Sequence, residues 1–231
     1  MTNTFRHSGG LGDMILGLPV VMTLGGIYYL HEHQHKVLGK LFDIQPYIEK
    51  VIDVPAGAWK DLKVTHNLDL FRGASKVSVA EMHLDAFNIK FDLTQKWLFN
   101  VEPTAVSRVV IHDTGSQRFP GRSVNWEVLR GYEKHCIFIG YDRDYQLFKQ
   151  DRKLDIPYYK TANLYEVAQV IAGSYLFIGN SSAPYTIAEG LKKHLVLDVY
   201  EGRPQYPFGH NSSVVLTEIT FLRDSGLKAV A

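Results

Sequence analysis

The sequence has a single cysteine, no long apolar run and almost no net charge, and each shortage excludes a class of protein. Cys136 is the only cysteine among 231 residues, so no intrachain disulfide framework can form. No apolar stretch reaches the roughly 18 residues of a membrane-spanning helix. The first ten residues, MTNTFRHSGG, lack the apolar core of a secretory signal. A formal net charge of +1 gives no reason to expect nucleic acid as a partner, so we expect a cytoplasmic protein without a transmembrane segment.

Hydrophobic residues make up 45% of the chain and charged residues 21%, as in ordinary globular proteins. Apolar segments typical of strands alternate with segments of helical spacing, which predicts an α/β fold. In the first half we expect helices over residues 14–24, 36–42 and 77–89, and strands over residues 27–30, 50–54 and 63–70. Pro19 should kink the first helix or start a new turn within it.

Turn-forming residues near position 100 indicate a boundary between two domains, residues 1–104 and 105–231. After it we expect strands over residues 109–111, 136–139, 174–178 and 195–199, and helices over residues 126–132, 164–172 and 185–193. Residues 113–123, 140–142 and 179–184 are expected to be loops. These apolar strands do not alternate with polar residues, which favours a parallel sheet covered on both faces.

The glycine-rich stretch Ser8–Asp13 lies between a short strand candidate and an apolar helix candidate. Gly10 and Gly12 would let a phosphate approach the backbone, and the free N–H groups of the following helix would bind it. Asp13 stands at the mouth of this turn, where a helix N-terminus stabilises a carboxylate. The simpler interpretation is a tight strand-to-helix connection with Asp13 as a cap. The glycine spacing is not G-x-G-x-x-G, and no Walker lysine-serine pair follows.

A second strand, loop and helix run from Phe177 to Leu191. Asn180, Ser181 and Ser182 offer hydroxyl and amide donors beside the free N–H groups of the helix, which suits a diphosphate. Glu189, further along this helix, is a candidate to hold a sugar hydroxyl. The alternative is an N-cap cluster followed by an exposed glutamate.

A third loop, residues 113–126, also follows a strand. The hydroxyls of Thr114 and Ser116, together with Arg118, could neutralise a phosphate. A solvated surface loop with mobile arginines is the alternative.

The segment His31–His35 has alternating histidines that could form a metal site. A polar connection between strand and helix is the preferred interpretation, because no partner cluster is evident. We therefore predict no metal ligands and no cofactor. A serine hydrolase is not supported, because no G-x-S-x-G motif is present.

Together, these loops resemble a known family. The stretch His7–Asp13, with Leu18-Pro19 after it, is similar to the N-terminal motif of GT-B glycosyltransferases: the GGLGD turn of glycogen synthases and the GD…P turn of lipopolysaccharide heptosyltransferases. Residues 177–191 resemble the heptosyltransferase loop that contacts the nucleotide diphosphate, and residues 113–126 resemble that family's phosphate-holding loop.

The resemblance implies two Rossmann-like domains with parallel sheets facing a cleft. It also implies metal-independent transfer of a sugar from a nucleotide-diphosphate donor to the hydroxyl of a saccharide or other acceptor, inverting if the heptosyltransferase likeness holds. By similarity, Asp13 would be the general base. The chain differs from the family pattern at Asn180, where an aspartate is usual, and at Tyr185, where a histidine is usual.

Two further interpretations stay open. One is a non-catalytic nucleotide-binding or assembly protein of the same fold. The other is a nicotinamide-dependent oxidoreductase, because Glu32 lies about 20 residues after the glycine turn.

Overall fold

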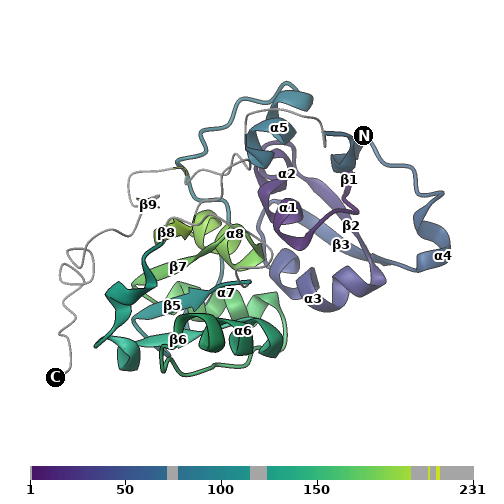
Figure 1. Ribbon diagram of the computed structural model, residues 1–231. Helices are drawn as coiled ribbons and strands as arrows, with labels where there is room; N and C mark the ends of the chain where they lie inside the picture. The colour runs from purple at the N-terminus through teal and green to yellow at the C-terminus, as the bar shows by residue number, and fades with distance from the viewer. Residues whose placement is uncertain (1, 72–77, 115–123, 199–207, 209–211, 214–231) are drawn as a thin grey trace.

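The computed structural model describes residues 2–71, 78–114, 124–198, 208 and 212–213, and these form two wholly parallel β-sheets (Figure 1). The first sheet has the strand order β3-β2-β1-β4. Its strands are β1 (Thr4–Arg6), β2 (Gly26–His31), β3 (Ile48–Val54) and β4 (His66–Asn67). The second has the order β6-β5-β7-β8-β9. Its strands are β5 (Val109–His112), β6 (Cys136–Phe138), β7 (Leu176–Asn180), β8 (His194–Asp198) and β9 (Ser212–Ser213). The expected pair of parallel α/β sheets is therefore confirmed.

Helices connect successive strands, as parallel pairing requires. In the first half these are α1 (Leu11–Leu16), α2 (Leu18–Leu24), α3 (Glu32–Asp43), α4 (Ala56–Trp59), the 3₁₀ turn η1 (Leu68–Phe71) and α5 (Val79–Ala86). In the second half they are the 3₁₀ turns η2 (Trp126–Leu129) and η3 (Glu133–His135), and the helices α6 (Asp142–Arg152), α7 (Leu164–Gly173) and α8 (Ala183–Gly190). No helix in these described ranges has the length and apolar character needed to cross a membrane.

The apolar run after the glycine turn forms two helices. The backbone changes direction at Gly17, which ends α1 and caps α2, and Pro19 occupies the first turn of α2. Proline is tolerated there because the first-turn N–H groups have no partner within the helix. The prediction that Pro19 starts a new turn is confirmed.

Several expected elements differ from the structure, among them the helix expected over residues 126–132, which is the shorter 3₁₀ turn η2. The strand expected over residues 63–70 is reduced to β4, because the side chain of Asn67 accepts a hydrogen bond from the N–H of Asp69 and turns the chain into η1. The loop expected over residues 179–184 is shorter at both ends, since Gly179 and Asn180 continue β7 and Ala183 begins α8. Asp142, expected in a loop, begins α6.

The two halves pack closely through helices (Figure 1). Helix α1 contacts α8, and α3 contacts α7. One continuous apolar core includes Phe5 and Tyr28 from the first half and Val110 and Phe177 from the second. The strands β5, β6 and β7 are buried along their whole length, as the unbroken apolar pattern predicted. The domain boundary between residues 104 and 105 stays a prediction, although each sheet takes its strands from one side of it.

Candidate functional site

The two glycine- and serine-rich turns meet in the structure. A Cβ atom placed on Gly12 would lie 3.4 Å from the backbone nitrogen of Ala183 and 3.4 Å from Cγ2 of Thr186. The first turn of α1 therefore packs directly on the N-terminal turn of α8, next to Ser182, which caps α8. Two stretches about 170 residues apart in sequence therefore lie side by side where the two halves meet.

Asp13 belongs to the first turn of α1, and its carboxylate turns back over the glycine turn. A Cβ atom on Gly10, the N-cap of α1, would lie 3.4 Å from Oδ2 of Asp13. Any larger residue at position 10 would therefore contact the carboxylate. The side chain is half-buried, so it keeps access to solvent and to a ligand beside the turn.

The side chains of two residues outside Gly9–Asp13 hold the beginning of the glycine turn. The N–H of Ser8 donates to Oδ1 of Asp69 over 2.8 Å, and the N–H of Gly9 donates to Nδ1 of His7 over 2.7 Å. The ring of His83 packs edge-on against that of His7, with the centroids 5.4 Å apart. Burial lowers the pKa of His83, whereas the charges of Asp13 and Asp69 act in the opposite direction.

Asn180 and Thr114 are brought together at the carboxyl ends of the neighbouring strands β7 and β5. Nδ2 of Asn180 donates to Oγ1 of Thr114 over 2.7 Å and to Oδ1 of Asp113 over 3.3 Å. Asp113 is 1% exposed and also forms an ion pair with Arg152, at 3.4 Å. The hydroxyl of Ser182 donates to the carbonyl oxygen of Asn180, and Ser181 lies half-buried between them. The amide and hydroxyl groups predicted to bind a diphosphate thus gather at one helix N-terminus.

The remaining predicted residues are Ser116, Arg118 and Glu189. Ser116 and Arg118 fall outside the described residues. Glu189 lies near the opposite end of α8, where it is 2% exposed and its carboxylate accepts hydrogen bonds from Lys192 and from the N–H of Phe208. Burial raises the pKa of Glu189 and lowers that of Lys192. A role for Glu189 in holding a sugar hydroxyl stays a prediction.

The histidine-rich segment forms the beginning of α3. The side chain of His31 caps this helix, and Oε1 of Gln34 accepts a hydrogen bond from the His31 N–H, which completes a capping box. Nδ1 of His33 lies 2.6 Å from Nδ1 of His31. Among the residues that the structure describes, no group of three or more histidine, cysteine or acidic side chains is arranged to hold a metal ion.

Sequence reasoning missed the roles of Asp69, His83 and Arg152. Asp69 and His83 contact the glycine turn only through the tertiary fold, and no local spacing connects them to it. Arg152 ends α6, a helix that the sequence did not predict, because its only buried residue is Phe148 and its apolar periodicity is weak.

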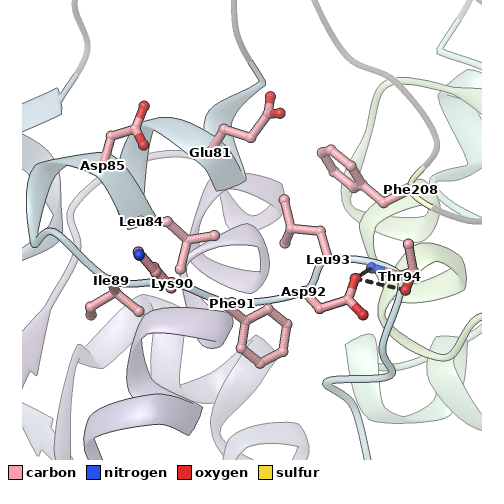
Figure 2. Close-up of a pocket in the computed structure, with 10 residues that line it drawn as sticks. All are labelled: Glu81, Leu84, Asp85, Ile89, Lys90, Phe91, Asp92, Leu93, Thr94 and Phe208. Carbon is pink, nitrogen blue, oxygen red and sulfur yellow. Dashed lines mark hydrogen bonds between the residues drawn. The ribbon is translucent and has the colours of Figure 1, made fainter.

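A separate groove of about 580 Å³ lies between α5 and residues 89–94 (Figure 2). It shares no lining residue with the predicted site. In Figure 2 the carboxylates of Glu81 and Asp85 project from α5, and Leu93 and Phe208 approach from the other side. Its lining residues are Glu81, Leu84, Asp85, Ile89, Lys90, Phe91, Asp92, Leu93, Thr94 and Phe208.

Neither a protein-family model nor a curated protein matches the sequence. Solved structures do match the fold. The glycosyl transferase family 9 protein of Veillonella parvula DSM 2008 is 13% identical with a TM-score of 0.62, over 99% of this chain and 90% of that one. The ADP-heptose lipopolysaccharide heptosyltransferase II of E. coli is 13% identical with a TM-score of 0.60, over 94% and 91%. The E. coli heptosyltransferase WaaC, solved with ADP, is 12% identical with a TM-score of 0.60, over 96% and 99%.

These likenesses define the class of fold. The chain has the two-sheet α/β architecture of these two heptosyltransferases and of the family 9 glycosyltransferase, the fold of the GT-B type that the resemblance implied. The resemblance of the glycine turn to that of glycogen synthases stays a prediction.

Proposed function

We propose that the protein is a metal-independent glycosyltransferase that moves a sugar from a nucleotide-diphosphate donor to an acceptor hydroxyl. The observation that carries the proposal is the contact between Gly12 and the N-terminal turn of α8. Through this contact, a half-buried carboxylate, Asp13, and a group of amide and hydroxyl donors lie on two facing helix ends. Transfer of a glycosyl group needs both parts, a base for the acceptor and stabilisation for the departing phosphate.

In this mechanism the carboxylate of Asp13 accepts the proton of the acceptor hydroxyl. The acceptor oxygen forms a bond to the anomeric carbon while the bond from that carbon to the diphosphate oxygen breaks. The electron pair of the broken bond stays on the diphosphate. Because a single displacement comes from the opposite side of the ring, the configuration at the anomeric carbon inverts.

The departing diphosphate would lie at the N-terminus of α8. The free N–H groups of the first turn and the hydroxyls of Ser181 and Thr114 would donate hydrogen bonds to its oxygens. The hydroxyl of Ser182 would join them by turning away from the carbonyl oxygen of Asn180. Asn180 would keep Thr114 in place, since its amide donates to that hydroxyl. Gly10 and Gly12 would let the donor or acceptor approach the backbone of the facing turn.

ADP and an ADP-sugar are the first ligands to test, because the E. coli neighbours were solved with ADP or are named for ADP-heptose. A thermal-shift screen with UDP, GDP, ADP, CDP, CMP, their sugar conjugates and NAD(H) identifies the base, because a ligand that binds only the folded state raises the melting temperature. We propose a cytoplasmic location and a saccharide or other hydroxyl acceptor.

Asp13→Asn separates catalysis from binding. We expect turnover of the donor to fall about 10²- to 10⁴-fold, while the thermal shift with the nucleotide is kept. Asp61→Asn, at an exposed position, is the matched control. Nucleotide binding without transfer in the wild type would instead support the non-catalytic alternative, and a shift with NADH alone would support the oxidoreductase.

A further inference from the structure

The first two amides of the glycine turn are already occupied by side chains. The N–H of Ser8 donates to Asp69 over 2.8 Å, and the N–H of Gly9 donates to Nδ1 of His7 over 2.7 Å. The two acceptor atoms, Nδ1 of His7 and Oδ1 of Asp69, lie 3.3 Å apart. We call these two side chains the latch, because they accept hydrogen bonds from two consecutive backbone N–H groups of the turn.

Each member of the latch is fixed by an element other than the turn. His7 is 1% exposed, and its carbonyl oxygen accepts a hydrogen bond from Nε2 of Gln34 on α3. Asp69 lies on η1, where its own N–H is held by Asn67. The latch therefore ties the glycine turn to α3 and to the end of β4.

His83 packs against His7, one of the two residues of the latch. Its ring is 3% exposed and stands at 87° to the ring of His7. A Cβ atom on Gly17 would lie 3.3 Å from Nδ1 of His83, so the ring also fits against the junction of α1 and α2. His7 thus holds the beginning of the turn, and His83 packs both against His7 and against the junction of the two helices that follow.

We propose that His7 and Asp69 are positioning residues, which fix the glycine turn and thereby the orientation of the Asp13 carboxylate toward the acceptor. This inference rests on the proposed function, in which Asp13 is the base. The physical reason is that glycine-rich backbone has many accessible conformations, whereas a catalytic carboxylate needs one geometry to within a fraction of an ångström. Two hydrogen bonds at Ser8 and Gly9 restrict the segment from which α1 starts.

The acceptor at His7 is the ring nitrogen Nδ1, which accepts from the N–H of Gly9. The amide oxygen of an asparagine occupies nearly the place of Nδ1, so His7→Asn keeps an acceptor and His7→Leu removes it. In the same way, Asp69→Asn keeps an oxygen acceptor for the Ser8 N–H, and Asp69→Leu does not.

The test combines two measurements on the full chain. Amide hydrogen exchange at Ser8 and Gly9 reports the latch itself, without any substrate. Turnover of the donor identified in the thermal-shift screen, together with the donor's Kd, reports the positioning of Asp13. Asp155→Leu, at an exposed position on the other half of the molecule, is the control for general effects of the substitution.

For Asp69→Leu and His7→Leu we expect at least tenfold faster exchange at the freed amide, a 10- to 100-fold fall in kcat and an unchanged Kd for the donor. Asp69→Asn and His7→Asn should restore most of the slow exchange and most of the kcat. If a leucine variant does not fold, Asp69→Ala makes the same test with less bulk.

Faster exchange with unchanged kcat would overturn the positioning role, and so would unchanged exchange in both leucine variants. Absence of turnover in the wild type would count against the proposed function, while exchange at Ser8 and Gly9 would still decide whether the latch exists.

Discussion

Gly12 lies on α1 in the first half of the molecule and Ala183 begins α8 in the second half. A Cβ atom on Gly12 would lie 3.4 Å from the backbone nitrogen of Ala183. The first turns of α1 and α8 therefore pack against each other, with the methyl group of Thr186 at the same distance from this position. This contact places the turn that carries Asp13 next to the loop from Asn180 to Ser182, the two parts that the proposed function needs.

Gly12→Val tests this contact. The branched side chain would meet the first turn of α8 and the methyl group of Thr186, so we expect a loss of about 1–3 kcal/mol in the free energy of unfolding. Gly57→Val is the matched control, because it also places valine in a helix, and a Cβ atom on Gly57 meets nothing within 4 Å. Chemical denaturation of both variants makes the comparison. Equal losses would show that helix propensity, and not the contact with α8, is responsible.

The strand–turn–helix units could be predicted from the sequence because their signals are local. The glycine residues at positions 9, 10 and 12, and the polar residues from Asn180 to Ser182 before a helix, mark turns by residue type alone. The parallel topology then followed from the alternation of strands and helices. The order of the three loop motifs along the chain indicated a fold of the GT-B type, which the solved neighbours share.

The rest depends on distant contacts. Asp69 reaches Ser8 across 61 positions, and a carboxylate beside Leu68 and Leu70 looks in the sequence like the polar position of a strand. Glu189 and Lys192 stand only three positions apart, a spacing at which helical side chains can pair, but their burial depends on how the end of α8 meets Phe208. Local periodicity carries no information about such distant contacts, so they became visible only in the structure.

Cys136 provides a simple probe of the second core. A lone cysteine at the start of an apolar run is most simply a small core residue, and the side chain is 1% exposed on β6. Burial raises the pKa of the thiol to about 12, so at pH 8 it is almost entirely protonated and unreactive. We expect labelling by a disulfide reagent to be very slow in the native protein and rapid in denaturant. Equally fast labelling in both states would contradict the burial of β6.

Asn180→Asp tests why an amide stands at the end of β7. The amide nitrogen lies 3.3 Å from a carboxylate oxygen of Asp113, which is itself 1% exposed. A second carboxylate there would repel the first, and this repulsion raises the pKa of the new group in the folded state.

A raised folded pKa means that stability is kept at low pH and lost as the pH rises. We therefore expect Asn180→Asp to be close to the wild type near pH 4 and about 1–3 kcal/mol less stable at pH 7.5. Asn163→Asp is the control, because Asn163 caps α7 through an oxygen atom that aspartate also has. An Asn180→Asp protein whose stability loss is the same at both pH values would contradict the repulsion from Asp113.

Lys192 connects the end of α8 to two other segments. Its ammonium group donates to Glu189, to the carbonyl oxygen of Leu93 and to that of Phe208, and it lies 4.3 Å from the ring centroid of Trp97. Lys192→Met removes the charge but keeps much of the apolar stem. Because Glu189 is 2% exposed, its carboxylate would be left buried without its cation, and we expect a loss of about 3 kcal/mol at pH 7.5.

The pH dependence gives the sharper test of this pair. Burial already raises the pKa of Glu189 above its ordinary value near 4.5, and Lys192 acts against that rise. In Lys192→Met the pKa of Glu189 should rise further, so the deficit against the wild type should be small near pH 4.5 and grow toward pH 8. Combining Lys192→Met with Glu189→Gln should recover part of the loss and remove most of the pH dependence.

Lys149→Met breaks an exposed pair with Asp155 and should cost no more than about 1 kcal/mol. A deficit of Lys192→Met that stays constant from pH 4.5 to pH 8 would mean that lost packing on Trp97, and not the buried charge of Glu189, causes the destabilisation.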